Sequence, residues 1–372
     1  PEHIEWDANA AEKGGYEHFM LKEMYEQPKA ILDTFSPRIK GNDIVIEELG
    51  MSDEEIKAIR KIMIVACGSA YHAGVTAKYV MEGMARIPVE TDLASEFRYR
   101  DPIMEDGTLV VIISQSGETA DSLAALREAK QRGAKVLGIV NVVGSSIARE
   151  ADNVMYTWAG PEIAVATTKA YSSQLIALYL LAMKFAFVRG EITDSEMRGY
   201  IEDLQKLPEQ VELLLNNKNR IQKFANRYLA AREVFFIGRG IDYAISMEGS
   251  LKLKEISYIH SEAYAAGRIE TRNHFSDRRG NTGNSDSYTE RAVQKEHQQY
   301  RGSKDQRSIL FLPLQMKEIM RLKKRQITLY TFRRPIDILQ ILWRSFRFSC
   351  SHITFPSEED AMWINRETWQ NL

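Results

Sequence analysis

The stretch VVIISQSGETADSLAAL, residues 110–126, decides how this chain can fold. It starts as an unbroken apolar run that ends at Ser114, which is typical of a strand buried on both faces. A short turn containing Gly117 follows, and apolar residues then recur at helical spacing from about Thr119. A strand, a glycine turn and a helix in this order predict one βα unit of a parallel sheet.

The same order continues on both sides of this stretch. Apolar runs predict parallel strands at residues 61–67, 107–114 and 134–141. Longer helical patterns between them predict helices at residues 71–85 and 119–133. The alternation predicts an α/β fold, namely a doubly wound parallel sheet flanked by helices.

A second unit of the same kind is expected further along the chain. Residues 232–260 repeat the strand, glycine turn and helix of residues 61–85, and helices expected at 170–188 and 195–216 lead to this repeat. Two copies of one α/β domain are the simplest interpretation. Within the second copy, apolar residues recur at helical spacing from Met247 to Ala266.

The regular pattern stops after Gly267. No clear alternation follows, although residues 308–314 and 335–343 are locally apolar. Residues 1–267 hold 30 Lys plus Arg against 39 Asp plus Glu, whereas residues 268–372 hold 19 against 12. Fourteen of those nineteen cations are scattered arginines, which differs from the lysine-rich run of a nucleic-acid-binding arm. We therefore expect no nucleic-acid partner.

Cysteine use and hydropathy limit the cellular setting. The two cysteines, Cys67 and Cys350, lie far apart and make no disulfide framework or metal cluster, so we expect no metal and a reducing, cytoplasmic location. No run approaches eighteen apolar residues, and the first fifteen residues lack the apolar core of a signal peptide. We expect no membrane partner. The start at Pro1 suggests a fragment or a processed chain.

The turn after residue 114 predicts an anion site. Unpaired N–H groups at a helix start bind anions, and Ser114, Ser116 and Thr119 add three hydroxyl groups there. Gly117 would let the backbone approach a ligand closely. Hydroxyls without a lysine suit a sugar phosphate better than a nucleoside triphosphate. The alternative is an ordinary helix cap by Ser116 or Thr119.

Two other turns are expected beside this loop. In ACGSAYHAG, Gly68 and Ser69 follow a predicted strand and should lie at the carboxyl edge of the sheet, where ligands of α/β sheets bind. His72 could be a general acid or base, but a packed or solvated histidine is the commoner case. In AVATTKAY, Thr167 and Thr168 could complete the ligand wall, and helix capping explains them equally well.

The helix in the second unit carries two charged residues on one face. Lys252 and Glu255 lie three residues apart, as a surface ion pair of small energy would. A carboxylate beside an amine also suits the proton transfer of sugar isomerisation. Spacing alone favours the surface ion pair.

Taken together, these motifs resemble the isomerase half of glutamine–fructose-6-phosphate aminotransferases. The resemblance runs from about Tyr16 to Gly267 and implies two sugar isomerase (SIS) domains. The stretches that carry it are HFMLKEMYEQP (18–28), ACGSAYHAG (66–74), ASEFRYRDP (94–102), ISQSGETADSL (113–123), PEIAVATTKAYSSQL (161–175) and LKLKEISYIHSEAYAAG (251–267).

The resemblance assigns site residues. It implies that Glu255 moves the proton between C1 and C2 of the open-chain sugar and that Lys252 supports it. Ala70 stands where some relatives carry serine, which removes one hydroxyl contact. The implied sugar-phosphate loop is Ser114, Gln115, Ser116 and Thr119, and the implied further substrate contacts are Ser69, Val165 and Thr167.

The family's later motifs, ELKHG and DVDKPRNLAKS, are absent as written. Codons can be chosen for residues 268–272 (AGA ATT GAA ACA CGG) so that dropping one base restores ELKHG. Codons for residues 361–372 restore DVDKPRNLAKS when two bases are dropped. We therefore hypothesise a frameshift near Gly267 and a second near residues 308–311.

The resemblance also implies a domain plan: a lead-in segment at 1–50 after a glutaminase domain that is missing here, a first SIS domain at 51–194 and a second at 220–372, family-like only to 267. The expected ligands are fructose 6-phosphate and glucosamine 6-phosphate, bound by a homodimer without a cofactor. The alternatives are another SIS-group isomerase or deglycase, or a non-catalytic sugar-phosphate-binding module. Without a glutaminase cysteine, this chain alone should not hydrolyse glutamine.

Overall fold

The structure is a computed structural model, and it describes residues 12–226, 229, 231, 233–265 and 310–314. Cys350, the apolar run at 335–343 and the segments 268–272 and 361–372, on which the frameshift hypothesis depends, lie outside the described residues. The domain boundaries predicted from the sequence remain predictions.

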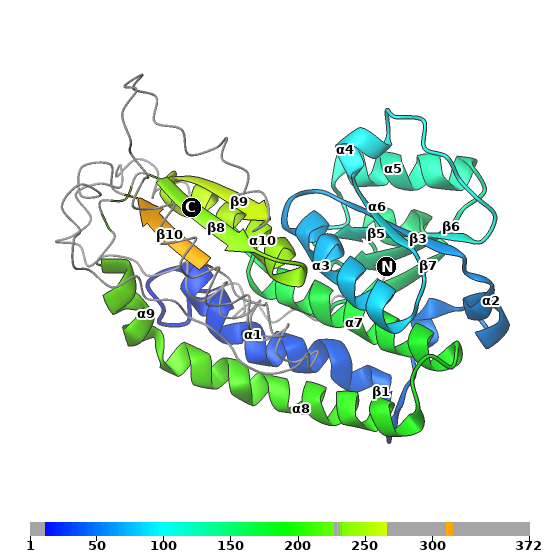
Figure 1. Cartoon of the computed structure of the whole chain (residues 1–372), viewed down its shortest axis with the longest axis horizontal. Helices are drawn as coiled ribbons and strands as arrows, with labels where there is room; N and C mark the ends of the chain where they lie inside the picture. The colour runs from blue at the N-terminus through cyan, green and yellow to red at the C-terminus, as the bar shows by residue number, and fades with distance from the viewer. Residues whose placement is uncertain (1–11, 227–228, 230, 232, 266–309, 315–372) are drawn as a thin grey trace, which may run out of the picture.

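A five-stranded parallel sheet forms the centre of the larger unit (Figure 1). This finding confirms the α/β fold and the expected strands at residues 61–67, 107–114 and 134–141. The strands at residues 89–93 and 153–156 were not predicted from the sequence, because both are short and carry polar residues. In sheet order, the strands are β4 (Val89–Leu93), β3 (Lys61–Ala66), β5 (Thr108–Ser114), β6 (Lys135–Val140) and β7 (Asn153–Tyr156).

Helices cover both faces of this sheet. Successive strand residues point to opposite faces, so Ile62 and Ile64 join one apolar cluster while Met63 and Val65 join the other. The first cluster is covered by α1 (Phe19–Phe35), α3 (Gly68–Met84), α7 (Lys169–Val188) and α8 (Asp194–Asn216). The second is covered by α4 (Ala94–Phe97), α5 (Ala120–Gln131) and α6 (Ser146–Glu150).

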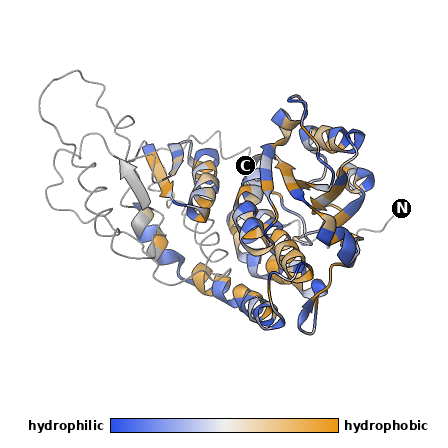
Figure 2. Cartoon of the chain, turned by 45° about the vertical axis from the view of Figure 1, so that its right-hand side comes forward, coloured by the Kyte–Doolittle hydropathy of each residue, from blue (hydrophilic) through white to orange (hydrophobic). Residues whose placement is uncertain are grey.

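Helix α7 is the central helix of the first layer. It packs against α1 and α3, and most of its side chains are buried. Its length and its mean hydropathy of 1.4 would suffice to cross a membrane, but 83% of its apolar window is buried inside the protein. Figure 2 shows apolar residues on the sheet and on the helices that pack against it. Burial within the fold explains the composition of α7.

The second unit contains β8 (Glu233–Gly238), α10 (Ile241–Ser257) and β9 (His260–Ala265), with β8 and β9 parallel. Strand β10 (Leu310–Leu314) pairs with β8 in the antiparallel direction. The helical interpretation of residues up to Ala266 is therefore wrong for residues 258–265, and Ala266 lies outside the described residues. Tyr258 adopts a left-handed conformation with φ of 56° and ends the helix, and pairing with β8 then makes the next segment a strand.

Short elements complete the described chain. The segment that leads from α1 to the sheet contains the 3-10 helices η2 (Ser36–Arg38) and η3 (Glu47–Leu49), the hairpin of β1 (Ile39–Lys40) and β2 (Asp43–Ile44), and α2 (Asp53–Ala58). Helix α9 (Lys218–Ala225) follows α8.

Candidate functional site

The strand order of the sheet identifies one favoured edge for a ligand. From β3 the chain moves to β4 on one side, whereas from β5 it moves to β6 on the other side. The loops after β3 and β5 therefore diverge at a topological switch point, where open α/β sheets bind their ligands. Ala66 pairs with Ile113, so the segments that follow β3 and β5, which carry Ser69 and Ser116, start side by side.

The loop after β5 brings its hydroxyl groups together. The hydroxyl oxygens of Ser114 and Thr119 lie 3.0 Å apart, and the backbone N–H of Gly117 donates to Ser114 Oγ at 3.0 Å. Ser116 Oγ accepts from the N–H of Glu118 at 3.2 Å. Thr119 is the N-cap residue of α5 but makes no side-chain cap bond, so the capping alternative is wrong for it. The carbonyl of Gln115 accepts from Asn141 N at 3.1 Å and fixes the loop to β6.

Two glycines with positive φ shape this edge, one by close packing and one by leaving space. A Cβ on Gly117, whose φ is 66°, would lie 2.0 Å from Ser145 Oγ, so only glycine fits there. Gly68 begins α3 with φ of 56°, and a Cβ placed on it would meet no atom within 4 Å. Open space therefore lies beside the backbone of Gly68. Ser69, the next residue, is 8% exposed.

The segment 161–168 precedes α7 and carries the predicted contacts Val165 and Thr167. Val165 is 75% exposed, whereas Thr167 donates its hydroxyl to Glu162 Oε2 at 2.6 Å. Glu162 Oε1 accepts from Thr168 N at 2.8 Å and from Ala170 N at 3.2 Å. Thr168 is the N-cap residue but its side chain makes no cap bond. Glu162 therefore caps α7, and the capping explanation of Thr168 is wrong.

A chain of charged side chains joins α3 to α10. His72 Nδ1 lies 2.8 Å from Glu248 Oε2, and Glu248 Oε1 lies 3.5 Å from Lys252 Nζ. Lys252 Nζ donates to Glu255 Oε2 at 2.5 Å. Lys252 is only 3% exposed, so the interpretation of this pair as a surface ion pair is wrong for the lysine. Glu255 has a side chain 37% exposed, which leaves its carboxylate accessible.

Glu248 is a buried carboxylate held in its charged form. Burial acts to raise the pKa of Glu248, but the hydrogen bond with His72 and the charge of Lys252 outweigh it, so the pKa is lowered. The hydroxyl group of Ser69 also contributes to the lowering of this pKa. One of the predicted substrate contacts therefore lies next to the helix that carries Glu255. His72 is packed against a carboxylate, as the commoner case predicted.

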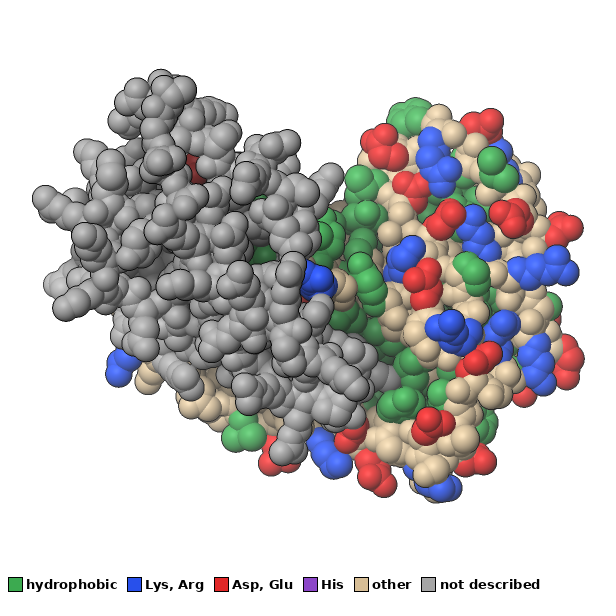
Figure 3. All heavy atoms as spheres, in the orientation of Figure 1, with side chains coloured by type: hydrophobic (Ala, Val, Ile, Leu, Met, Phe, Trp, Pro, Cys, Tyr) green, Lys and Arg blue, Asp and Glu red, His purple; other side chains and the backbone are tan. Residues whose placement is uncertain are grey.

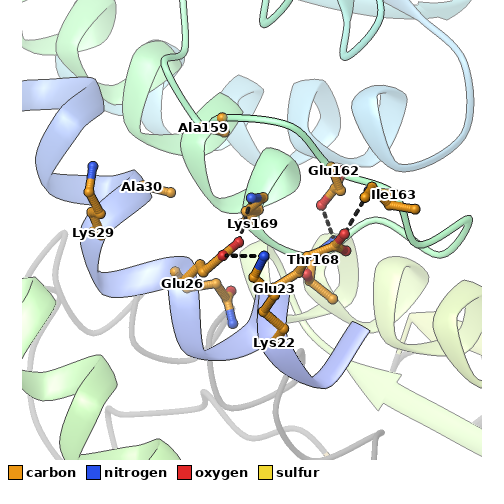
Figure 4. Close-up of polar contacts among 12 residues, drawn as sticks. Lys22, Glu23, Glu26, Lys29, Ala30, Ala159, Glu162, Ile163, Thr168 and Lys169 are labelled. Carbon is orange, nitrogen blue, oxygen red and sulfur yellow. Dashed lines mark hydrogen bonds and ion pairs between the residues drawn. The ribbon is translucent and has the colours of Figure 1, made fainter. Parts of the chain in front are cut away.

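Glu23 on α1 is a further buried carboxylate, and it contacts the backbone of segment 161–168 (Figure 4). Its Oε1 accepts from Ile163 N at 2.6 Å and from Ala164 N at 3.1 Å. Burial raises the pKa of Glu23 to about 7. Burial also raises the pKa of Glu162.

Sequence reasoning missed Glu23, Glu162 and Glu248. Each is one of many acidic residues in its segment, and each gains its role from a partner that is distant in sequence or on an adjacent turn. The only available signal was position: Glu23 and Glu248 lie on the buried faces of their helices. A charged residue on a buried face has a partner in most proteins.

Among the described residues, no group of three or more His, Cys, Asp or Glu side chains could hold a metal ion. Figure 3 shows blue and red side chains interspersed over the visible face of the larger unit, without the one-sign stripe that binds nucleic acid.

Comparison with known proteins identifies relatives for most of the described chain. The family described as SIS domain matches residues 55–184 and 228–277. The glutamine–fructose-6-phosphate aminotransferase of Caldanaerobacter subterraneus subsp. tengcongensis is 60% identical over 268 residues, which are 72% of this chain and 44% of that relative. The chain thus spans less than half the length of this curated relative.

Two solved structures resemble this chain to different extents. The C-terminal domain of glucosamine-fructose-6-phosphate aminotransferase from Francisella tularensis is 42% identical, with a TM-score of 0.67 over 70% of this chain and 73% of that one. Tagatose-6-phosphate ketose/aldose isomerase from Escherichia coli is 14% identical, with a TM-score of 0.58 over 94% of this chain and 95% of that one. The second likeness shows the fold alone.

Proposed function

The chain belongs to the glutamine–fructose-6-phosphate aminotransferase family, and we propose that it binds fructose 6-phosphate as the isomerase part of such an enzyme. The whole reaction would convert fructose 6-phosphate to glucosamine 6-phosphate with glutamine as the nitrogen donor. The family resemblance suggests the substrate, and the hydroxyl groups of the loop after β5 support a phosphate site at that loop.

The arrangement of hydroxyl groups in residues 114–119 is the observation that carries this proposal. Ser114 and Thr119 lie 3.0 Å apart at the start of α5, where no side chain caps the helix. A phosphate there would accept hydrogen bonds from hydroxyls and from the first-turn N–H groups, and the helix dipole favours its negative charge. Gln115, Ser116 and Ser69 complete the proposed phosphate and sugar contacts.

The second unit would supply the proton transfer. Glu255 has an accessible carboxylate, and Lys252 donates a hydrogen bond that orients it. We assign Glu255 as the base that removes a proton from one carbon of the open-chain sugar and returns it to the neighbouring carbon. Lys252 is in turn held by Glu248, which is bonded to His72 of the first unit. Val165, Thr167 and Gly68 would line the sugar.

A double substitution tests the binding site. Ser116→Ala with Thr119→Ala should weaken fructose 6-phosphate binding at least about a hundredfold, because each hydrogen bond to a charged group contributes about 1.5–3 kcal/mol. Calorimetric titration measures the affinity, and thermal melting checks the fold. Ser195→Ala, which removes an exposed hydroxyl on α8, is the matched control. Unchanged affinity in the double variant would refute the phosphate site.

A non-catalytic sugar-phosphate-binding module is the second candidate function. The observation in its favour is that the family resemblance stops near Gly267, before the two motifs that the resemblance requires for ring opening and site closure. Solvent-proton exchange at the sugar, followed by NMR, separates the two: binding without exchange indicates the module.

Resequencing of the DNA that encodes residues 262–372 tests the frameshift hypothesis. If ELKHG and DVDKPRNLAKS appear in one open frame, the native protein has a complete isomerase domain, whereas an unchanged sequence leaves half a site.

We also propose a cytoplasmic homodimer, because the family resemblance implies dimeric sites. Light scattering measures the molar mass of the purified chain in solution. A mass equal to that of one protomer would contradict the dimer.

A further inference from the structure

We infer that Glu23, on the helix that precedes the first α/β unit, is a positioning residue for sugar-phosphate binding because it holds the backbone of segment 161–168. This inference rests on the proposed function, in which Val165 and Thr167 of this segment contact the sugar. Glu23 lies 2% exposed on α1, about 140 positions before its partners.

The segment has few other supports. It contains no regular secondary structure between β7 and α7, and both Ile163 and Val165 are exposed. Glu162 holds its carboxyl end through Thr167, Thr168 and Ala170. Glu23 holds its middle, since one carboxylate oxygen accepts from two consecutive N–H groups. Without Glu23, both amides lose their acceptor.

The groups around Glu23 compensate the charge of its carboxylate only in part (Figure 4). Its Oε2 is buried and has no hydrogen-bond partner among the described residues. Glu162 raises and Lys169 lowers the pKa of Glu23, and both effects are smaller than that of burial. Lys169, 3% exposed, pairs with Glu26 at 2.6 Å, and Lys22 lies 3.5 Å from Glu26 on the same helix. The nearby lysines therefore pair with Glu26.

The ionised form of Glu23 should hold the segment more tightly than the neutral form, because a hydrogen bond to a charged acceptor is about twice as strong. Glu23→Gln keeps an acceptor oxygen but cannot ionise. Above about pH 7, the amides of Ile163 and Ala164 should then exchange with solvent at least about tenfold faster in Glu23→Gln than in the unsubstituted chain. Below about pH 6 the two proteins should exchange alike.

This exchange experiment separates positioning from general stability. Glu23→Gln removes the burial of a charge and should make the whole protein more stable above pH 7, which by itself would slow exchange. Faster exchange confined to residues 163–164 supports positioning, and slower or equal exchange overturns it. If the variant fails to fold, the pH profile of the unsubstituted chain decides: protection of the two amides, corrected for intrinsic exchange, must rise from about pH 6 to about pH 8.

Binding provides the second measurement. At about pH 8, Glu23→Gln should bind fructose 6-phosphate about three- to tenfold more weakly than the unsubstituted chain, and the loss should vanish at about pH 6. Asp33→Asn, which removes a partly exposed carboxylate that pairs with Lys29 on the same helix, is the control and should change neither exchange nor affinity. No binding by the unsubstituted chain would refute the proposed function, while the exchange result still decides the role of Glu23.

Discussion

Two buried carboxylates in this protein, Glu23 beneath segment 161–168 and Glu248 between α3 and α10, are shifted in opposite directions. Glu23 is 2% exposed and its pKa is raised to about 7. Glu248 is 3% exposed and its pKa is lowered. Burial is the largest cause in both cases, so burial alone does not explain the difference.

The partners explain it. Glu23 accepts from two neutral backbone amides, which compensate only part of the cost of burying a charge. Glu248 has two basic side chains as partners, His72 at 2.8 Å and Lys252 at 3.5 Å. The comparison teaches that a carboxylate partnered by basic side chains stays charged in the interior, whereas one partnered by amides is poised to titrate.

Removing Glu248 should have the largest effect. Glu248→Ala leaves Lys252 buried with Glu255 as its remaining partner among the described residues, and it removes the acceptor of His72, so the free energy of unfolding should fall by about 3–5 kcal/mol. Urea denaturation measures this change. Lys254→Ala, at an exposed position of the same helix, should change it by less than about 0.5 kcal/mol. Equal effects of the two substitutions would mean that the linked side chains from His72 to Glu255 do not stabilise the contact between the units.

The pH dependence of Glu23 should have the opposite sign from that of an ordinary ion-paired carboxylate. Its folded pKa of about 7 exceeds the ordinary value of 4.5, so the folded state keeps a proton that the unfolded state loses. The free energy of unfolding should therefore fall as pH rises from 4.5 through about 7, by about 3 kcal/mol in total relative to Glu23→Gln. Denaturation at several pH values measures the difference, and a constant difference would show that Glu23 does not titrate there.

The smallest effect is expected from His72. His72→Gln can still donate to Glu248 but cannot carry a charge, so we expect a loss of about 1 kcal/mol at neutral pH. Because the lowered pKa of Glu248 gives stability that is lost as pH falls below 4.5, the variant should also lose less stability in acid than the unsubstituted chain. Acid titration of the unfolding free energy measures both effects. An unchanged acid limb would mean that Lys252 alone keeps Glu248 charged.

The sequence predicted the inner strands and long helices because their signals are local. Strands β3, β5 and β6 are continuous apolar runs, and α5, α7 and α8 begin and end within two residues of their expected positions. The edge strands β4 and β7 carry no such run, because an edge strand is half exposed and accepts polar residues. The segment His260–Ala265 was mistaken for helix since its apolar spacing is ambiguous and only pairing with β8 makes it a strand.

The candidate site divides in the same way. The hydroxyl loop could be predicted from the sequence, because residues within six positions of one another and between a strand and a helix must lie together. It also placed Lys252 and Glu255 on one helix face. The folded protein was needed to show that Lys252 is buried, that Glu248 joins it to His72 and that Glu23 contacts the backbone of Ile163. These contacts join positions more than a hundred residues apart, and a carboxylate has no local pattern that indicates which distant donor it will meet.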